Sequence, residues 1–452
     1  MSIKDKFLKK SNSFNFYKEN YERLKSNESI LNDELKDRTI QLEKTQQSIE
    51  SLKQELDSSK KECSNLNERI DELMRSIELL KKRVDYSNEC GKIDLKDINI
   101  AYVLNSFPNV SETFIVNEVK WLVENGYSIK VFMKTDAVKP VEIDFKVDIL
   151  KFDSTDSLEE LLVENKIDLI HTHYAFPICN NFTHPVAEKL CIPFTFFAHA
   201  VDIFAERSSE LNNIAEVSRS KYCKAIFTLS EYHKNYLIGQ NALEEKIVIT
   251  KQATGYELSE IRPKTNGIKR IVSISRFVEK KGLDVLIDAA KLLEGEDFVF
   301  EIYGFGKLEE ELQNQIDDLG CTNISIKGEL SPDEVKDVLL NSDLLASSVK
   351  IAKNGDRDGF PTVIFEAMAN GLPVLTTKVS AIPEIIKDHE NGFIIEPENP
   401  QLLADKIIEI SQLSDDEMFE IRKKAQEDVK NISSVEKTMN RYMETINDVL
   451  CD

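Results

Sequence analysis

The first 90 residues of this 452-residue chain contain neither glycine nor proline. Both residue types interrupt helices, so their absence over so long a stretch argues against a series of turns and favours one continuous helix. A run of about 18 apolar residues, the length that a membrane-spanning helix needs, is found nowhere in the sequence. We therefore expect a soluble protein that begins with a long helix.

Cysteine pairs of the C-x-x-C type are also absent, and the seven cysteines are odd in number. In a chain of this length, the pattern favours reduced thiols over a disulfide framework and predicts a cytoplasmic location. Positive charge is scarce as well, since 58 lysines and arginines stand against 80 acidic residues, for a net charge of −22. Such a surface repels phosphates, so the composition argues against nucleic-acid binding.

The N-terminal stretch MSIKDKFLKKSNSF has no apolar core of signal-peptide length. Its lysines surround Phe7 and Leu8, and this mixture would allow weak peripheral association with a membrane. A solvated tail is the simpler interpretation, and the sequence does not decide between the two.

Mostly apolar residues recur every seven positions in two registers, one from Tyr21 to Val84 and the other from Leu24 to Leu80, where Arg38, Thr45 and Ser59 weaken the middle. This is the period of the a and d positions of a coiled coil, and leucine or β-branched residues there favour parallel dimers. We therefore predict that residues 1–92 form a coiled-coil oligomerisation segment that makes a homodimer. Pairing with another protein, or a single helix folded back on the rest of the chain, remains open.

Strand-like and helix-like runs alternate from residue 98, beginning with INIAYVLNSF and FIVNEVKWLVENG. Alternation of this kind predicts parallel βαβ units. After the looser stretch KQATGYELSEIRPKTNG, the pattern restarts with RIVSIS. We expect an α/β fold with two Rossmann-like domains, residues 93–258 and 259–432, that face a cleft. A ligand would bind in that cleft, at the carboxyl ends of the strands.

Two acids flank a predicted helix in the stretch NGDRDGFPTVIFEAMANGLPV. Pro361 is suited to the first helical position, and the helix would run to Ala369. Asp358 precedes the turn. Glu366 lies in the helix, roughly 8 Å along its axis from Pro361. Because a helix N-terminus attracts phosphates and sugar hydroxyls, the pair could bind two parts of one ligand. The candidate ligand-binding residues here are Gly359, Phe360, Pro361, Thr362 and Glu366.

Two cations follow the first strand of the second domain. Arg276 lies at the predicted strand exit and Lys281 just before the next helix, as a diphosphate clamp requires. Solvated surface charges are the alternative interpretation. Gly304 and Gly306 likewise follow a strand, where the backbone could approach a ligand closely, although a G-x-G pattern alone is a weak signal.

Three histidines lie at strand ends in the first domain. His171 and His173 share one face of their strand, but no third ligand stands at a suitable spacing, so we predict no metal site. His199, three residues before Asp202, is the better candidate for hydrogen bonding to a sugar. The D-x-D pattern at Asp356 and Asp358, which holds a metal ion in another class of sugar transferases, is interpreted as a coincidence.

The chain from residue 97 to about 450 resembles the family-4 retaining glycosyltransferases of the GT-B fold. The resemblance rests on SISRFVEKKGLDVLIDAA, IYGFGKLEEEL, SDLLASS, and DGFPTVIFEAMANGLPVLTT followed by IPEII and NGFIIEP. These motifs follow one another in the order and at the spacing of the family. The first domain, with AYVLNSFPNVSETFIVNEVKWL, HTHYA and PFTFFAHAVDIF, is similar to the subgroup that builds exopolysaccharides of the colanic-acid type.

The resemblance implies roles for individual residues. Glu366 would bind the ribose of a nucleotide-sugar, and Asp358 would contact the transferred sugar, although the family usually has glutamate there. Arg276 and Lys281 match the diphosphate-binding pair, and His199 matches the cleft histidine. SFPNVSETF replaces a glycine-rich loop of other members. The acceptor-side candidates are Ser111, Glu112 and Asp202.

The resemblance also implies an activity. A hexose-type sugar would pass, with retained configuration, from a UDP- or GDP-sugar to a glycan or lipid-linked acceptor in cell-surface polysaccharide synthesis. No metal or further cofactor is implied, and the leaving phosphate would help to deprotonate the acceptor. A C-terminal helix, residues 433–452, would cross back to the first domain. The alternatives are a nucleotide-sugar 2-epimerase of the same fold and an inactive domain that serves a coiled-coil scaffold.

Overall fold

The computed structural model describes residues 94–109, 112–204, 211–261 and 267–451, together with residues 50, 53, 56–61, 63–67, 69–70 and 74. The chain divides into two compact units, Met1–Glu78 and Leu79–Asp452. The described residues of the first unit are helical. Most of the predicted coiled coil lies outside the described residues, so its pairing stays a prediction. The described part contains no helix that is long and apolar enough to cross a membrane.

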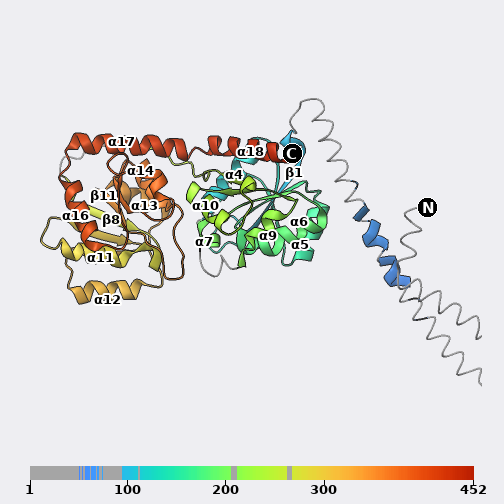
Figure 1. The fold of residues 1–452 in the computed structure, drawn as a ribbon, viewed down its shortest axis with the longest axis horizontal. Coiled ribbons are helices and arrows are strands. Elements are labelled where there is room, and N and C mark those ends of the chain that lie inside the picture. The colour runs from blue at the N-terminus through green and yellow to red at the C-terminus, as the bar shows by residue number, and fades with distance from the viewer. Residues whose placement is uncertain are drawn as a thin grey trace, which may run out of the picture. The chain divides into compact units, whose positions relative to one another are not determined.

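The first half of the second unit is built on a seven-stranded parallel sheet (Figure 1). Its strand order is β3-β2-β1-β4-β5-β6-β7. The strands are β1 (Asn99–Ser106), β2 (Ser128–Thr135), β3 (Asp148–Lys151), β4 (Leu169–His173), β5 (Phe194–Phe197), β6 (Cys223–Thr228) and β7 (Ile247–Ile249). β4 and β5 are buried throughout, as expected of parallel strands that helices cover on both faces.

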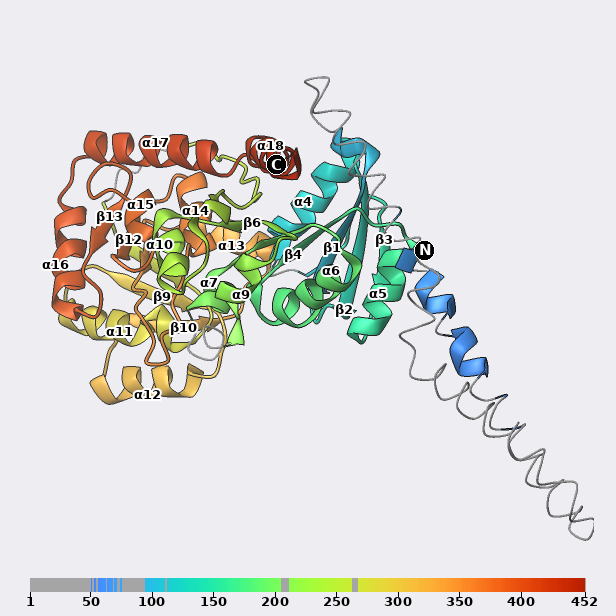
Figure 2. The same ribbon diagram turned by 45° about the vertical axis from the view of Figure 1, so that its right-hand side comes forward.

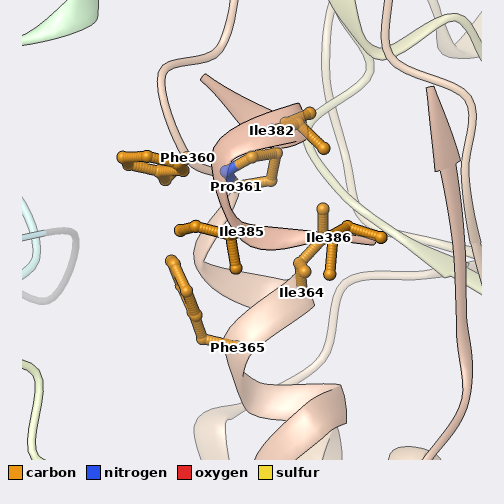
Figure 3. Close-up of a pocket in the computed structure, with 7 residues that line it drawn as sticks. All are labelled: Phe360, Pro361, Ile364, Phe365, Ile382, Ile385 and Ile386. Atoms are coloured by element: carbon orange, nitrogen blue, oxygen red, sulfur yellow. The ribbon is translucent and has the colours of Figure 1, made fainter. Parts of the chain in front are cut away.

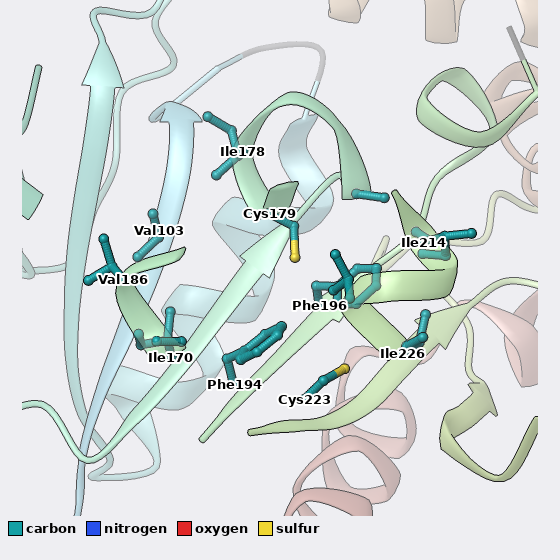
Figure 4. Packing of buried hydrophobic residues seen from close by; sticks show 14 of the residues in the cluster. Val103, Ile170, Ile178, Cys179, Val186, Phe194, Phe196, Ile214, Cys223 and Ile226 are labelled. Atoms are coloured by element: carbon teal, nitrogen blue, oxygen red, sulfur yellow. The ribbon is translucent and has the colours of Figure 1, made fainter. Parts of the chain in front are cut away.

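Side chains that alternate along β1 enter two different apolar layers. Ala101 and Val103 join the layer shown in Figure 4, whereas Tyr102 and Leu104 join the layer beneath α4. The period of two along a strand explains this division. The helical segments are η1 (Leu95–Asp97), α4 (Thr113–Glu124), α5 (Thr155–Glu164), η3 (Ala175–Thr183), α6 (His184–Leu190), α7 (Ala200–Ile203), α9 (Ile214–Arg219), α10 (Glu231–Gly239) and η4 (Glu244–Lys246).

The second half contains a six-stranded parallel sheet with the order β10-β9-β8-β11-β12-β13 (Figure 2). Its strands are β8 (Arg270–Ile274), β9 (Val299–Tyr303), β10 (Ile324–Gly328), β11 (Leu344–Ser347), β12 (Val374–Thr377) and β13 (Phe393–Ile395). Its helical segments are η5 (Glu279–Lys281), α11 (Leu283–Leu292), α12 (Glu309–Leu319), α13 (Pro332–Leu340), α14 (Thr362–Ala369), α15 (Ile382–Ile385), α16 (Pro400–Ser411) and α17 (Asp415–Ile432). Both sheets therefore have the Rossmann-like architecture expected from the alternating pattern.

The last helix, α18 (Val435–Cys451), belongs to the core of the first half although it follows the second half in sequence. Met439, Tyr442, Met443 and Ile446 are buried in the same apolar layer as β1 and α4. These positions repeat at helical spacing, so one face of α18 covers the first sheet. The chain thus crosses between the two sheets twice.

Candidate active site

The loop between β11 and α14 carries two acids that contact two lysines. Nζ of Lys281 lies 2.5 Å from Oδ2 of Asp358, and Nζ of Lys280 lies 3.3 Å from Oδ1 of Asp358 and 3.0 Å from Oδ1 of Asp356. Burial alone would raise the pKa of Asp358, but the two lysines together hold that pKa below its usual value. We call Lys280, Lys281, Asp356 and Asp358 the acid–lysine cluster. The cluster gives each acid of the D-R-D pattern a lysine partner.

Glu366 has a different environment from Asp358. It lies on α14, and burial raises the pKa of its carboxyl. Its carboxylate makes no hydrogen bond or ion pair with any described residue, although it acts electrostatically on the nearby Tyr256. A desolvated acid without a partner is unfavourable unless a ligand supplies hydrogen bonds. The two acids are therefore distinguished by structure, one paired with lysines and the other available.

The helix that carries Glu366 begins at Thr362, one residue later than the sequence predicts, with Pro361 at the N-cap. Because proline cannot cap with its side chain, the first N–H groups of α14 have no side-chain cap. Phe360 and Pro361 line an apolar pocket together with the isoleucines of α14 and α15 (Figure 3). The pocket is lined by Phe360, Pro361, Ile364, Phe365, Ile382, Ile385 and Ile386.

Gly304 and Gly306 support the segment that carries Arg276. Both have positive φ. A Cβ on Gly304 would lie 1.8 Å from the carbonyl oxygen of Ser275, and a Cβ on Gly306 would lie 2.5 Å from that of Phe277. Glycine is therefore required for this close backbone packing. The exposed side chain of Arg276 makes no ion pair or hydrogen bond with the described residues, so its charge is free to meet a ligand.

On the other sheet, His199 follows β5 and occupies the N-cap of α7. Its Nε2 lies 3.0 Å from Nδ1 of His173, whose Nε2 lies 3.1 Å from Oε2 of Glu118. Burial lowers the pKa of His199 well below its usual value, with a further contribution from the neighbouring His173. His199 is therefore an uncharged imidazole at neutral pH.

Tyr174 interacts with groups from both halves of the unit. Its hydroxyl donates to Oε1 of Glu112 at 2.8 Å, and its ring lies 4.6 Å from that of His199. Burial raises the pKa of Tyr174, and Glu112 raises it further, whereas the charge of Arg276 acts in the opposite direction. Tyr174, which contacts both Glu112 and His199, is thus within electrostatic reach of Arg276, the cation after β8.

Asp202 is buried rather than open to a ligand. Its carboxylate accepts from the backbone N–H of Ala175, and one oxygen, Oδ1, has no partner. Burial raises the pKa of Asp202 to about 8, although the backbone N–H groups act against the rise. Its position indicates a structural role in the turn after β4. Ser111 lies outside the described residues.

The fold supplies the third side chain that the sequence did not reveal beside His171 and His173. Glu118 joins them in a buried group whose ligand atoms lie within 4.8 Å of one another. No third ligand stands at a suitable spacing in the sequence, and Glu118 joins the two histidines only because the fold brings α4 next to β4. Both ring nitrogens of His173 already have partners, so hydrogen bonding explains its position without a metal.

Arg357 connects the acid–lysine cluster to α10. Its Nη1 donates to the hydroxyl of Tyr232 at 2.8 Å, and its guanidinium lies 5.1 Å from the ring centre of Phe204. Two residues along the chain, a Cβ on Gly359 would come within 2.7 Å of Nε2 of His233, which is also on α10. The turn before α14 is therefore held against the first half of the unit.

Two family descriptions match this chain. "Glycosyl transferases group 1" matches residues 257–431, and "Glycosyltransferase Family 4" matches residues 111–251. The first range contains the whole second sheet, the second contains β2 to β7 of the first sheet, and together they contain the described residues of the site.

Individual proteins give the same result. An uncharacterised glycosyltransferase of Methanocaldococcus jannaschii is 31% identical over 253 residues, covering 56% of this chain and 68% of that protein. The amylovoran biosynthesis glycosyltransferase AmsK of Erwinia amylovora is 25% identical over 378 residues, which cover 70% of this chain and 91% of AmsK. The putative colanic acid biosynthesis glycosyltransferase WcaL of Escherichia coli is 30% identical over 194 residues, which cover 41% of this chain and 47% of WcaL.

Solved structures show the same fold. A glycosyltransferase from Rickettsia africae superposes with a TM-score of 0.62 at 19% identity, covering 78% of this chain and 99% of that one. HepE of Anabaena, crystallised with UDP, superposes with a TM-score of 0.61 at 17% identity, covering 78% and 100%. Together with the sequence matches, these structures show that the chain is an enzyme that belongs to the group 1 glycosyltransferases of the GT-B fold.

Proposed function

We propose that the protein is a retaining glycosyltransferase that moves a hexose-type sugar from a UDP- or GDP-sugar to a glycan or lipid-linked acceptor in the cytoplasm. The observation that carries this proposal is the contrast between the two acids around α14. Asp358 is neutralised by Lys281 and Lys280, whereas Glu366 is desolvated and its carboxylate has no hydrogen-bond or ion-pair partner among the described residues. An extended ligand that has a neutral polyol at one end and a sugar at the other would contact both acids, the polyol at Glu366 and the sugar at Asp358.

The ribose of the nucleotide is the proposed partner of Glu366. A pair of vicinal hydroxyls can donate two hydrogen bonds to one carboxylate, which would satisfy the acid that burial otherwise destabilises. Thr362 and the uncapped N–H groups of α14 begin about one turn before Glu366 and would face the phosphates. The nucleotide would then lie along the N-terminal half of α14.

Arg276 and Lys281 are the proposed diphosphate ligands. Negative charge develops on the leaving diphosphate, so fixed cations there stabilise the transition state more than the ground state. Lys281 is held by its ion pair with Asp358, while Arg276 is exposed and unpaired in the described chain. A preformed lysine and an adaptable arginine would therefore divide the charge of the diphosphate.

The acceptor side is assigned to the first sheet. Tyr174 is within electrostatic reach of Arg276 and contacts Glu112 and His199, and the three polar groups lie at the carboxyl ends of the strands, where α/β folds bind ligands. The leaving phosphate would help to deprotonate the acceptor hydroxyl, so that transfer occurs on one face of the sugar. This would retain the configuration of the anomeric carbon.

The relatives support an acceptor in polysaccharide synthesis. AmsK is named for amylovoran and WcaL for colanic acid, and HepE was crystallised with UDP-glucose. A UDP-hexose is therefore the first donor to test. The coiled coil predicted for residues 1–92 would join two such enzymes in a homodimer.

A screen of UDP- and GDP-sugars by thermal shift, followed by an assay of donor hydrolysis, tests the proposal. One sugar nucleotide should raise the melting temperature and be hydrolysed slowly when no acceptor is present. Arg276→Ala is the matched control. It removes one of the two proposed diphosphate ligands, and because this cation is exposed, the substitution leaves the core undisturbed. Conversion of the donor to its 2-epimer would overturn the proposal, and so would the absence of any shift across the panel.

A further inference from the structure

A chain of three buried side chains ends at His199. Glu118 on α4, His173 at the end of β4 and His199 after β5 are exposed by only 4%, 0% and 5%, respectively. The two links of the chain measure 3.1 Å and 3.0 Å. Because the three residues come from different elements, their alignment requires the packing of α4 over two neighbouring strands.

The rings are held in place by their neighbours. The ring of His173 stacks on that of Phe197 with an angle of 5° between their planes, and the ring centres of His199 and Phe197 are 4.6 Å apart. Phe114 covers both histidines, at 5.7 Å and 5.3 Å. Neither imidazole can turn without displacing an aromatic core residue, so the hydrogen bonds have a fixed direction in space.

The chemistry of the first link sets the direction of the second. An ionised carboxylate can only accept, so the proton of His173 is on Nε2, which faces Glu118. In a neutral imidazole the other nitrogen is then an acceptor. Nδ1 of His173 consequently accepts from Nε2–H of His199, which leaves Nδ1 of His199 without a proton.

We propose that Glu118 and His173 are positioning residues that hold His199 in the Nε2–H tautomer, so that its unprotonated Nδ1 accepts a hydrogen bond from a sugar hydroxyl. Nδ1 of His199 makes no hydrogen bond with the described residues, and unlike Nε2 of His171 it is not sealed from solvent. A histidine in the opposite tautomer would present a donor at the same point and would select a different partner atom.

This inference rests on the proposed function for the identity of the hydroxyl, but the tautomer does not depend on it. The opposite direction would require one more proton in the chain, either on the carboxyl of Glu118 or on His173 as an imidazolium. Burial lowers the pKa of both flanking histidines, His171 and His199, so this core disfavours charged imidazole.

The test is nitrogen-15 NMR of the full chain labelled at histidine, without ligand. The chain has six histidines, and His199→Asn and His173→Gln assign the two resonances of interest. His199 should show a protonated Nε2 and an unprotonated Nδ1. A protonated Nδ1 would overturn the inference, whether or not the protein transfers sugar.

Two variants of Glu118 separate positioning from mere packing. Glu118→Gln keeps an oxygen that accepts from His173, so the tautomer of His199 should persist. Glu118→Leu removes the acceptor and should give a mixture of tautomers, with kcat lowered by roughly up to 100-fold and affinity for UDP or GDP unchanged. If Glu118→Leu keeps its fold by thermal melting and retains the wild-type tautomer, the chain of hydrogen bonds does not control His199.

Discussion

Replacing Asp358 by asparagine tests the acid–lysine cluster. The side chains of Asp358, Lys280 and Lys281 are 11%, 5% and 13% exposed, so the variant leaves two nearly buried lysines with Asp356 as their remaining acid in the cluster. Removing one member of a buried ion pair costs about 3–5 kcal/mol. We therefore expect Asp358→Asn to lower the free energy of unfolding by an amount of this order.

A nucleoside diphosphate should reverse much of this loss. Its phosphates would supply the negative charge that Lys281 has lost, so UDP or GDP should stabilise Asp358→Asn more than it stabilises the wild type. Turnover should fall, because the proposed contact of Asp358 is with the transferred sugar. Thermal melts with and without the nucleotide, paired with transfer rates, measure both effects.

Asp356→Asn is the control for this prediction. Asp356 contacts Lys280 alone in the cluster and its side chain is 23% exposed, so the cost should be smaller, about 1 kcal/mol. An Asp358→Asn protein that is as stable as the wild type, or that the nucleotide stabilises less than the wild type, would refute the reasoning about the cluster.

Three further predictions follow from the fold. Burial raises the pKa of Asp202 from 3.8 to about 8, so the stability that the protonated carboxyl contributes is fully present below about pH 4, where the unfolded chain is also protonated, and is lost as pH rises through 8. Asp202→Asn should therefore gain about 1.4 kcal/mol per pH unit relative to wild type in that window, measured by urea unfolding, and a difference independent of pH would contradict this. Arg357→Leu removes the hydrogen bond to Tyr232, so the two halves of the unit should separate more readily, and an unchanged radius of gyration in X-ray scattering would count against it. A chain that starts near Lys92 should be monomeric by light scattering, and a dimer of that fragment would show that the predicted coiled coil is not what joins the subunits.

The strands that carry the site were predictable because they are buried on both faces. Runs such as IDLIHTHYA and RIVSIS are apolar enough to be recognised as parallel strands, and they correspond to β4 and β8. The short strand β3 could not be predicted in the same way, because it is an edge strand whose residues are largely exposed and have no apolar pattern. Strand exits then located Arg276 and His199 from topology alone.

The contacts within the site were less predictable. Glu118 and His173 are 55 positions apart, and Arg357 and Tyr232 are 125 positions apart, so no local spacing links them. Tyr174 gave no signal either, since a tyrosine after a strand is common in cores. Lys280 stood beside a predicted phosphate ligand in the sequence, but only the fold shows that it is buried against Asp356.

Titration calorimetry of UDP and GDP against the wild type and Glu366→Ala tests the central claim most directly. We predict that the wild type binds at least one of the two, and that Glu366→Ala binds it more weakly by about 1.5–3 kcal/mol, because charged hydrogen bonds to the ribose are lost. This loss corresponds to a Kd roughly 10- to 150-fold higher. Equal affinity of the two proteins for the nucleotide would contradict the assignment of Glu366 and of the nucleotide site along α14.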